Sequence, residues 1–218
     1  MNKIDYSLML VSDYRIKDNH KFLNIIESAL ISGATIIQLR EKDVDTSFFY
    51  NRAFLVKKLC NKFKVPLIIN DRLDIALAVN ADGLHIGQKD IKYEIARSHL
   101  GANKIIGISI SNINELYIAN NTGANYIGLS PIFSTITKTD HLANPLGIEG
   151  LRLITKISNK PIISIGGINK SNVSKVICNG SDGVAVISAI SESRDPEKET
   201  KILIQKINRA KIEVQNNT

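Results

Sequence analysis

The sequence contains few cysteines and no tryptophan. Its 218 residues include two cysteines, Cys60 and Cys178, which are far apart and have neither a CxxC partner nor a neighbouring histidine. Two isolated cysteines are too few for a disulfide framework or a structural zinc site. We therefore expect a cytoplasmic protein in which both thiols are buried and unreactive on helices.

Long apolar runs are also missing. The chain begins with polar residues, and the apolar stretch from Leu8 to Val11 is shorter than the roughly 7 to 15 residues of a signal peptide's apolar region. No other run approaches the ~18 apolar residues that cross a bilayer. We therefore expect neither secretion nor a membrane partner.

The charge balance is basic, but the basic residues do not form a stripe. Lysine and arginine total 28 against 21 aspartate and glutamate residues, which gives a net charge of +7. The densest cluster, from Lys57 to Lys64, falls in an expected helix that needs a solvated face. Because no aromatic residues alternate with a basic stripe, nucleic acid is disfavoured as a partner, and an anionic small substrate suits the charge.

Short apolar segments alternate with amphipathic ones along the whole chain. Short, nearly continuous apolar runs are typical of strands that are buried on both faces, whereas apolar residues at helical spacing indicate helices. The expected strands are 8–11, 35–39, 66–70, 83–86, 104–108, 125–129, 161–165 and 183–187. The expected helices are 21–31, 47–61, 71–79, 92–100, 112–121, 147–157, 170–178 and about 197–214.

This alternation predicts a parallel sheet, and the number of repeats favours closure into a (β/α)8 TIM barrel. Residues 1–218 show no linker or composition break, so we expect a single domain with a frayed end at 215–218. A doubly wound open sheet is the main alternative. Gly33, Gly123 and Gly180 are expected left-handed helix ends, and Ser171 is a candidate N-cap.

In such a barrel, the polar residues that follow the strands meet at one mouth, where the site forms. Gly166 and Gly167, after the seventh strand, let backbone N–H groups approach an anion, and Ile187 and Ser188 direct a helix start toward the same place. These residues predict a phosphate site. Taken alone, the glycine pair would also suit an ordinary turn.

Three cations and two carboxylates are expected at the same mouth. Arg40, Lys42 and Lys138 could hold a diphosphate, and Asp71 with Asp90 suits Mg²⁺, which is usually bound by one or two carboxylates together with substrate phosphate oxygens. The alternative is that the two aspartates cap the third and fourth helices.

The segment 130–145 is long for a barrel loop and has a charged tip, which is typical of a lid that closes Lys138 over a substrate. Thr135 and Thr137 in this segment either bond their own backbone or bind a second anion. His85 falls within the fourth strand, where a packed, hydrogen-bonded histidine is expected rather than a general base. No Ser-His-Asp or Cys-His set can be assembled at the strand ends.

Several motifs occur together and in order. They are Gln38-Leu39-Arg40-Glu41-Lys42, Ile69-Asn70-Asp71-Arg72, Ala81-Asp82-Gly83-Leu84-His85-Ile86-Gly87-Gln88, Thr135-Ile136-Thr137-Lys138, Ile165-Gly166-Gly167-Ile168-Asn169 and Asp182-Gly183-Val184-Ala185-Val186-Ile187-Ser188. In this combination the chain resembles the thiamine-phosphate synthase family from near residue 8 to near residue 190.

The resemblance implies a (β/α)8 barrel transferase of thiamine biosynthesis with one Mg²⁺ per active site. Such an enzyme joins 4-amino-2-methyl-5-hydroxymethylpyrimidine diphosphate to 4-methyl-5-(2-phosphoethyl)thiazole, and it releases diphosphate by a dissociative substitution. The family's substrates are small phosphorylated molecules, and its habit suggests a small homo-oligomer.

Residue by residue, the resemblance assigns three sets of positions. The pyrimidine-diphosphate site falls on Gln38, Arg40, Lys42, Asn70, Ser109 and Lys138, of which Arg40, Lys42 and Lys138 carry the catalytic role. The magnesium ligands fall on Asp71 and Asp90. The thiazole-phosphate site falls on Thr135, Thr137, Gly167, Ile187 and Ser188.

One stretch departs from the family pattern. Members often carry Ala-His-Thr or similar after the serine of the fifth strand, whereas Ile110-Ser111-Asn112 follows Ser109 here. The related thiazole tautomerases use a histidine near this position and lack the metal aspartates, so Ser111 disfavours them. A catalytically silent anion-binding protein is the alternative from another class, but it should have lost Asp71, Asp90 or Lys138.

Overall fold

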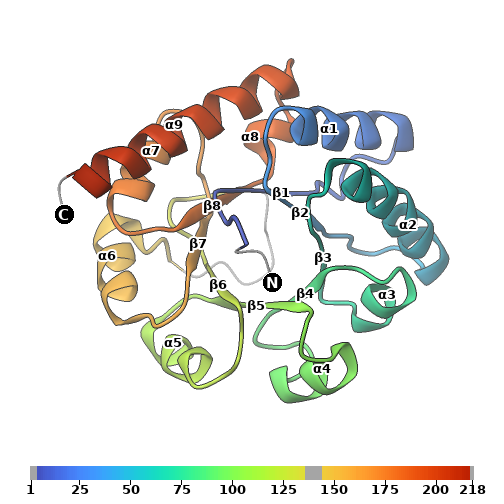
Figure 1. Ribbon diagram of the computed structural model, residues 1–218, viewed down its shortest axis with the longest axis horizontal. Helices are drawn as coiled ribbons and strands as arrows, with labels where there is room; N and C mark the ends of the chain where they lie inside the picture. The colour runs from blue at the N-terminus through green and yellow to red at the C-terminus, as the bar shows by residue number, and fades with distance from the viewer. Residues whose placement is uncertain (1–3, 136–143, 217–218) are drawn as a thin grey trace.

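The computed structural model describes residues 4–135 and 144–216 as a barrel of parallel strands surrounded by helices (Figure 1). Neighbouring strands pair in chain order, and β8 returns to pair with β1, so the sheet is closed. The strands are β1 (Leu8–Val11), β2 (Ile36–Leu39), β3 (Leu67–Asn70), β4 (Gly83–Ile86), β5 (Ile105–Ile110), β6 (Tyr126–Leu129), β7 (Ile162–Ile165) and β8 (Gly183–Val186). The predicted (β/α)8 barrel is confirmed, and the open-sheet alternative is excluded.

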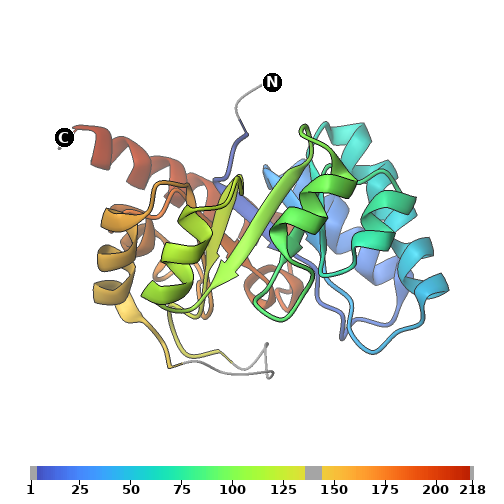
Figure 2. The ribbon, with the colours of Figure 1, turned by 90° about the horizontal axis from the view of Figure 1, so that it is seen from below.

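Helices cover the outside of the barrel, as the two perpendicular views show (Figures 1 and 2). They are α1 (Asn19–Ile31), α2 (Thr46–Phe63), α3 (Leu73–Ala78), α4 (Tyr93–Leu100), α5 (Ile113–Asn120), α6 (Gly147–Ile157), α7 (Val173–Cys178), α8 (Ser188–Ser191) and α9 (Pro196–Asn216). In the described ranges, no helix combines the length and the apolar character that crossing a membrane requires.

Two features of the helices differ from the prediction. The short helix α8 is absent from the predicted set of helices, because four residues are too few to show a helical period, although it begins at Ser188, where the sequence placed a helix start. The last helix, α9, continues to Asn216, past the point at which the sequence placed a frayed end; residues 217–218 lie outside the described residues.

The strands are buried on both faces. The barrel interior contains one apolar cluster: Met9, Val11, Ile36, Ile68, Ile105, Tyr126, Ile163 and Ala185. Alternate residues on the same strands, such as Leu8, Leu10 and Ile37, belong to the larger cluster between strands and helices. This double burial explains why the strand sequences are almost continuously apolar.

Side-chain caps begin four of the described helices. Asp18, Asp45, Asn112 and Asp195 each accept a hydrogen bond from the backbone N–H three residues later. The prediction that Ser171 caps α7 was wrong, because the Ser171 hydroxyl donates to Asn169 Oδ1 instead, at 2.6 Å.

Two of the three predicted left-handed helix ends are confirmed. Gly33 and Gly180 have φ values of 102° and 100°, which favour glycine. Gly123 does not adopt a positive φ; a Cβ there would instead overlap the Tyr93 hydroxyl, so the requirement at this position is for space.

Residues that follow β1 make hydrogen bonds to the end of the short helix α8. The buried Asp13 carboxylate accepts hydrogen bonds from Arg15 Nη2 at 2.7 Å and from Ser191 Oγ at 3.2 Å, and Arg15 also reaches Glu192 Oε1 at 2.6 Å. Burial opposes ionisation of Asp13, but the hydrogen bonds from Arg15 and Ser191 outweigh it and lower the pKa of this carboxyl. An ionised side chain therefore joins the segments that follow the first and last strands.

We expect Cys60 and Cys178 to differ sharply in reactivity. Cys60 is buried in α2, and burial raises the pKa of its thiol to about 12, whereas Cys178 is exposed at the end of α7. The prediction of a buried thiol is thus correct for Cys60 and wrong for Cys178. A chromogenic disulfide reagent such as DTNB should titrate one thiol per native chain and two after denaturation. Rapid reaction of both thiols in the native protein would contradict the burial of Cys60.

Replacing Asp13 should weaken the fold in a pH-dependent way. At neutral pH we expect Asp13→Asn to lower the free energy of unfolding by roughly 1.5–3 kcal/mol, the usual contribution of hydrogen bonds to a charged group. The pKa of Asp13 is lower in the folded state, so the stabilisation is present above the unfolded pKa of about 3.9 and is lost as pH falls through the folded value. Urea unfolding at decreasing pH should show the two proteins converging in acid. A constant difference would mean that the charge of Asp13 is not responsible.

Candidate active site

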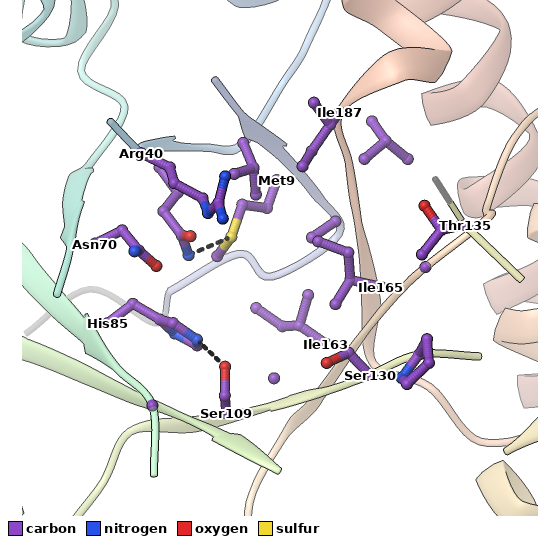
Figure 3. Close-up of a pocket in the computed structure, with 18 of the residues that line it drawn as sticks. Met9, Arg40, Asn70, His85, Ser109, Ser130, Thr135, Ile163, Ile165 and Ile187 are labelled. Atoms are coloured by element: carbon purple, nitrogen blue, oxygen red, sulfur yellow. Dashed lines mark hydrogen bonds between the residues drawn. The ribbon is translucent and has the colours of Figure 1, made fainter. Parts of the chain in front are cut away.

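A cavity of about 590 Å³ opens at the carboxyl ends of the strands (Figure 3). It brings together every predicted site residue that the structure describes: Gln38, Arg40, Lys42, Asn70, Asp71, Asp90, Ser109, Thr135, Gly167, Ile187 and Ser188. Thr137 and Lys138 lie outside the described residues, so their positions and the lid expected over 130–145 stay predictions.

Arg40 enters the cavity directly after β2 as a buried cation. Its backbone N–H donates to Ser12 Oγ at 2.8 Å, and its guanidinium lies over the Tyr14 ring, 5.0 Å from the ring centroid. The residue is 8% exposed, and its Nη1 atom has no hydrogen-bond partner among the described residues. Because the residue also lines the cavity, its guanidinium suits an anionic ligand.

A buried ion pair supports the segment that carries Arg40. Arg52 Nη1, on α2, donates to Glu41 Oε1 at 2.8 Å, and both side chains are almost completely buried. Arg52 also donates to Asn19 Oδ1 and to the Ile16 carbonyl, so one guanidinium joins α2, the start of α1 and the end of β2. Loss of either partner would leave a buried charge unpaired, which is strongly destabilising.

Lys42 and two aspartates form a second charged group at the mouth. Lys42 Nζ lies 2.8 Å from Asp71 Oδ2, and the Asp71 and Asp90 carboxyls are near enough to shift each other's pKa. Burial would raise the pKa of Asp71, but Lys42 and Asp90 outweigh it and lower this pKa. Burial and the Asp71 carboxylate raise the pKa of Asp90. Such opposite pKa shifts are expected for two neighbouring carboxyl groups, because the negative charge of the first to ionise disfavours ionisation of the second.

Neither aspartate caps a helix, so that alternative is wrong. The residues that precede α3 and α4 are Arg72 and Lys92, and neither helix start has a side-chain cap. Asp71 has a left-handed φ of 62°, and Asp90 Oδ2 accepts the backbone N–H of Gly87 at 2.6 Å, which closes the segment after β4. Both carboxyls are held at the cavity by their loops rather than by helix ends.

Backbone donors gather on the β7 and β8 side of the mouth. Gly166 and Gly167 have positive φ values of 109° and 63°, and a Cβ on Gly167 would lie 2.6 Å from the Ser134 carbonyl oxygen. Ser188 begins α8, where the first backbone N–H groups of a helix have no intrahelical acceptor. This corner can therefore donate to an anion through the main chain.

Polar side chains also lie deeper in the cavity. His85 Nε2, on β4, lies 2.7 Å from Ser109 Oγ (Figure 3). Its Nδ1 lies 2.9 Å from Tyr126 Oη. The prediction of a hydrogen-bonded barrel histidine is confirmed. Ser109 lies within β5 rather than after it, because the strand ends at Ile110, two residues later than predicted. On another side, Gln38 Nε2 lies 3.4 Å from Met9 Sδ.

The sequence prediction missed the apolar and aromatic wall of the cavity. Met9, Val11, Tyr126, Ile163 and Ile165 line it from within the strands. Their alternate spacing was the available signal. In a strand buried on both faces, however, both sets of alternating residues are apolar, so the pattern does not show which set faces inward.

Comparison with known proteins identifies the family. The family model described as thiamine monophosphate synthase matches residues 8–190. A thiamine-phosphate synthase of Clostridium novyi (strain NT) is 45% identical over 200 residues, which cover 92% of this chain and 98% of the relative. One from Clostridium botulinum (strain Kyoto / Type A2) is 48% identical over 193 residues, which cover 88% and 94%.

A solved structure of similar sequence supports the same assignment. Thiamine phosphate pyrophosphorylase from Pyrococcus furiosus superposes with a TM-score of 0.86 at 35% identity, over 95% of this chain and 98% of that one. The chain therefore belongs to the thiamine-phosphate synthase family and is a transferase of thiamine biosynthesis.

Proposed function

We propose that this protein joins 4-amino-2-methyl-5-hydroxymethylpyrimidine diphosphate to 4-methyl-5-(2-phosphoethyl)thiazole and releases thiamine phosphate and diphosphate. The observation that carries the proposal is the cavity itself. Its β2 side supplies the Arg40 guanidinium, and its β7 and β8 side supplies main-chain donors at Gly167 and Ser188. Two phosphorylated substrates can therefore bind in one mouth.

The β2 and β3 side suits the diphosphate. Arg40 and Lys42 would bind its oxygens, and the resemblance adds Lys138 from the segment outside the described residues. Gln38, Asn70 and Ser109 lie at the same cavity and would hold the pyrimidine. Figure 3 shows Arg40 across the cavity from Thr135. The thiazole phosphate would bind on that far side, at Thr135, Gly167, Ile187 and Ser188, and the resemblance adds Thr137 from outside the described residues.

Asp71 and Asp90 fit one Mg²⁺ ion. Both carboxyls line the same cavity and shift each other's pKa, so they are neighbours that suit one cation, and Lys42 at 2.8 Å from Asp71 already offsets part of their charge. The described residues contain no group of three or more His, Cys, Asp or Glu side chains at one place, so the remaining ligands would come from diphosphate and water. Bound there, Mg²⁺ would neutralise charge on the diphosphate leaving group.

The reaction needs charge stabilisation more than a general base. The carbon–oxygen bond to diphosphate breaks first, and its electron pair leaves with the diphosphate, where Arg40, Lys42 and Lys138 stabilise it. The thiazole nitrogen then donates its lone pair to the pyrimidine-methyl cation and forms the new carbon–nitrogen bond. No proton is transferred. His85, the histidine in the cavity wall, is engaged by Ser109 and Tyr126, which agrees with this scheme.

The first test is product formation by the purified protein from both substrates, with and without Mg²⁺. We expect diphosphate and thiamine phosphate to appear in equal amounts and only with the metal. Absence of product from verified substrates, with thiazole phosphate still bound, would favour a silent anion-binding protein. A cytoplasmic location and a small homo-oligomer stay predictions from the sequence.

Removing one of the two carboxylates should weaken Mg²⁺ binding and slow the reaction. We expect Asp90→Asn to lower kcat roughly 100-fold, since metal charge stabilisation contributes several kcal/mol, and to raise the Mg²⁺ concentration that gives half-maximal rate. Asp74→Asn is the matched control, because Asp74 pairs with Arg72 at 2.6 Å outside the cavity. An unchanged Mg²⁺ dependence in Asp90→Asn would remove Asp90 from the metal site.

A further inference from the structure

Two aromatic side chains in the cavity wall have no role in the proposed chemistry. Tyr126 on β6 and His85 on β4 stack inside the barrel with their ring centroids 5.5 Å apart. Tyr126 is 1% exposed and His85 is 7% exposed, yet each carries polar atoms. Buried polar atoms at this depth are costly unless each is hydrogen-bonded, so their partners are informative.

The barrel interior makes room for these two rings. A Cβ at Gly107, on β5, would overlap the Tyr126 ring, and a Cβ at Gly128, on β6, would lie 2.9 Å from His85 Cε1. Larger residues at either position would displace the rings. The positions of the Tyr126 and His85 rings therefore depend on glycine at both neighbouring strand positions.

The hydroxyl of Tyr126 determines the direction of the first hydrogen bond. Burial raises the pKa of Tyr126, so the phenol keeps its proton, and a buried hydroxyl proton needs an acceptor. Within the described ranges, His85 Nδ1, 2.9 Å away, is the acceptor in hydrogen-bonding geometry. Tyr126 therefore donates to His85.

The second hydrogen bond follows from the first. A neutral imidazole has one donor nitrogen and one acceptor nitrogen, and the partner of one determines the other. With Nδ1 as the acceptor, Nε2 carries the proton and donates to Ser109 Oγ, 2.7 Å away. The Ser109 oxygen is then used as an acceptor, and its own proton is available to the cavity that it lines.

We propose that Tyr126 and His85 are positioning residues that hold Ser109 as a hydrogen-bond donor toward a ring nitrogen of the aminopyrimidine. The identity of this ligand rests on the proposed function, whereas the direction of the chain from Tyr126 through His85 to Ser109 rests on the geometry. A fixed donor at this point favours a ring with an acceptor nitrogen. A ring that presents an N–H there is rejected, because two facing donors are both left unpaired.

The tautomer of His85 tests the donor-to-acceptor direction of the hydrogen bonds from Tyr126 to Ser109, and it needs no activity measurement. In protein labelled with ¹⁵N-histidine, long-range ¹H–¹⁵N NMR spectra show which ring nitrogen carries the proton, and His85→Gln assigns the signals. We expect the Nε2–H tautomer in the wild type and loss of this preference in Tyr126→Phe. The Nδ1–H tautomer, or a doubly protonated ring, in the wild type would overturn the proposal.

Tyr6→Phe is the matched control for both measurements. The Tyr6 ring packs against that of Tyr126, with the ring centroids 5.6 Å apart, and its hydroxyl donates to the Asn125 carbonyl. Tyr6 therefore belongs to the same packed region but not to the hydrogen-bond chain from Tyr126 to Ser109. We expect the His85 tautomer and the kinetic constants of Tyr6→Phe to match the wild type. Thermal melting of each variant shows whether it is folded.

Steady-state kinetics test whether the hydrogen-bond chain from Tyr126 affects substrate binding through Ser109. We expect Tyr126→Phe to raise KM for the pyrimidine diphosphate about tenfold, the value of one hydrogen bond, and to leave KM for the thiazole phosphate unchanged. In a Ser109→Ala background, the same substitution should add nothing. An equal penalty with and without Ser109 would make Tyr126 merely structural and would overturn the proposal. If the wild type forms no thiamine phosphate, the proposed function fails, while the tautomer still decides the direction of the chain.

Discussion

Parallel closure of the barrel is the constraint on which the rest of the structure depends. Pairing of β8 with β1 means that every strand is hydrogen-bonded on both edges and points the same way. The segments that follow the strands must then meet at one mouth, however far apart they are in the chain. The Asp13 contacts with Arg15 and Ser191 reinforce this closure, because they join the segments after the first and last strands.

The mouth has two halves that present different kinds of hydrogen-bond donor. On the β2 and β3 side the donors are charged side chains, and the buried Arg52–Glu41 pair supports the segment that carries Arg40. On the β7 and β8 side the donors are backbone N–H groups, which requires glycine at Gly167 because a side chain would meet the Ser134 carbonyl. Under the proposed function, the charged half suits a diphosphate that must leave, and the main-chain half suits a phosphate that only needs to be held.

The polar part of the site could be predicted, because polar residues interrupt the apolar rhythm where each strand ends. Arg40, Asp71 and Asp90 stood out in this way, and the structure brings all three to the cavity. Tyr126 and Met9 gave no such signal, since they lie among apolar residues on strands that are buried on both faces. Thr137 and Lys138 were identified from the motif, and they lie outside the described residues.

The amino-acid sequence by itself determined the order of strands and helices, the barrel class and the residues at the strand ends, because these depend on local periodicity and on motifs. Only the tertiary structure decided which contacts those residues make. It paired Lys42 with Asp71, left the Arg40 Nη1 donor unused within the described chain, and showed that Asp90 closes its own loop instead of capping a helix. It also placed His85 between Tyr126 and Ser109. Such contacts join residues from different strands, and their geometry depends on the register and closure of the whole barrel, which no local pattern encodes.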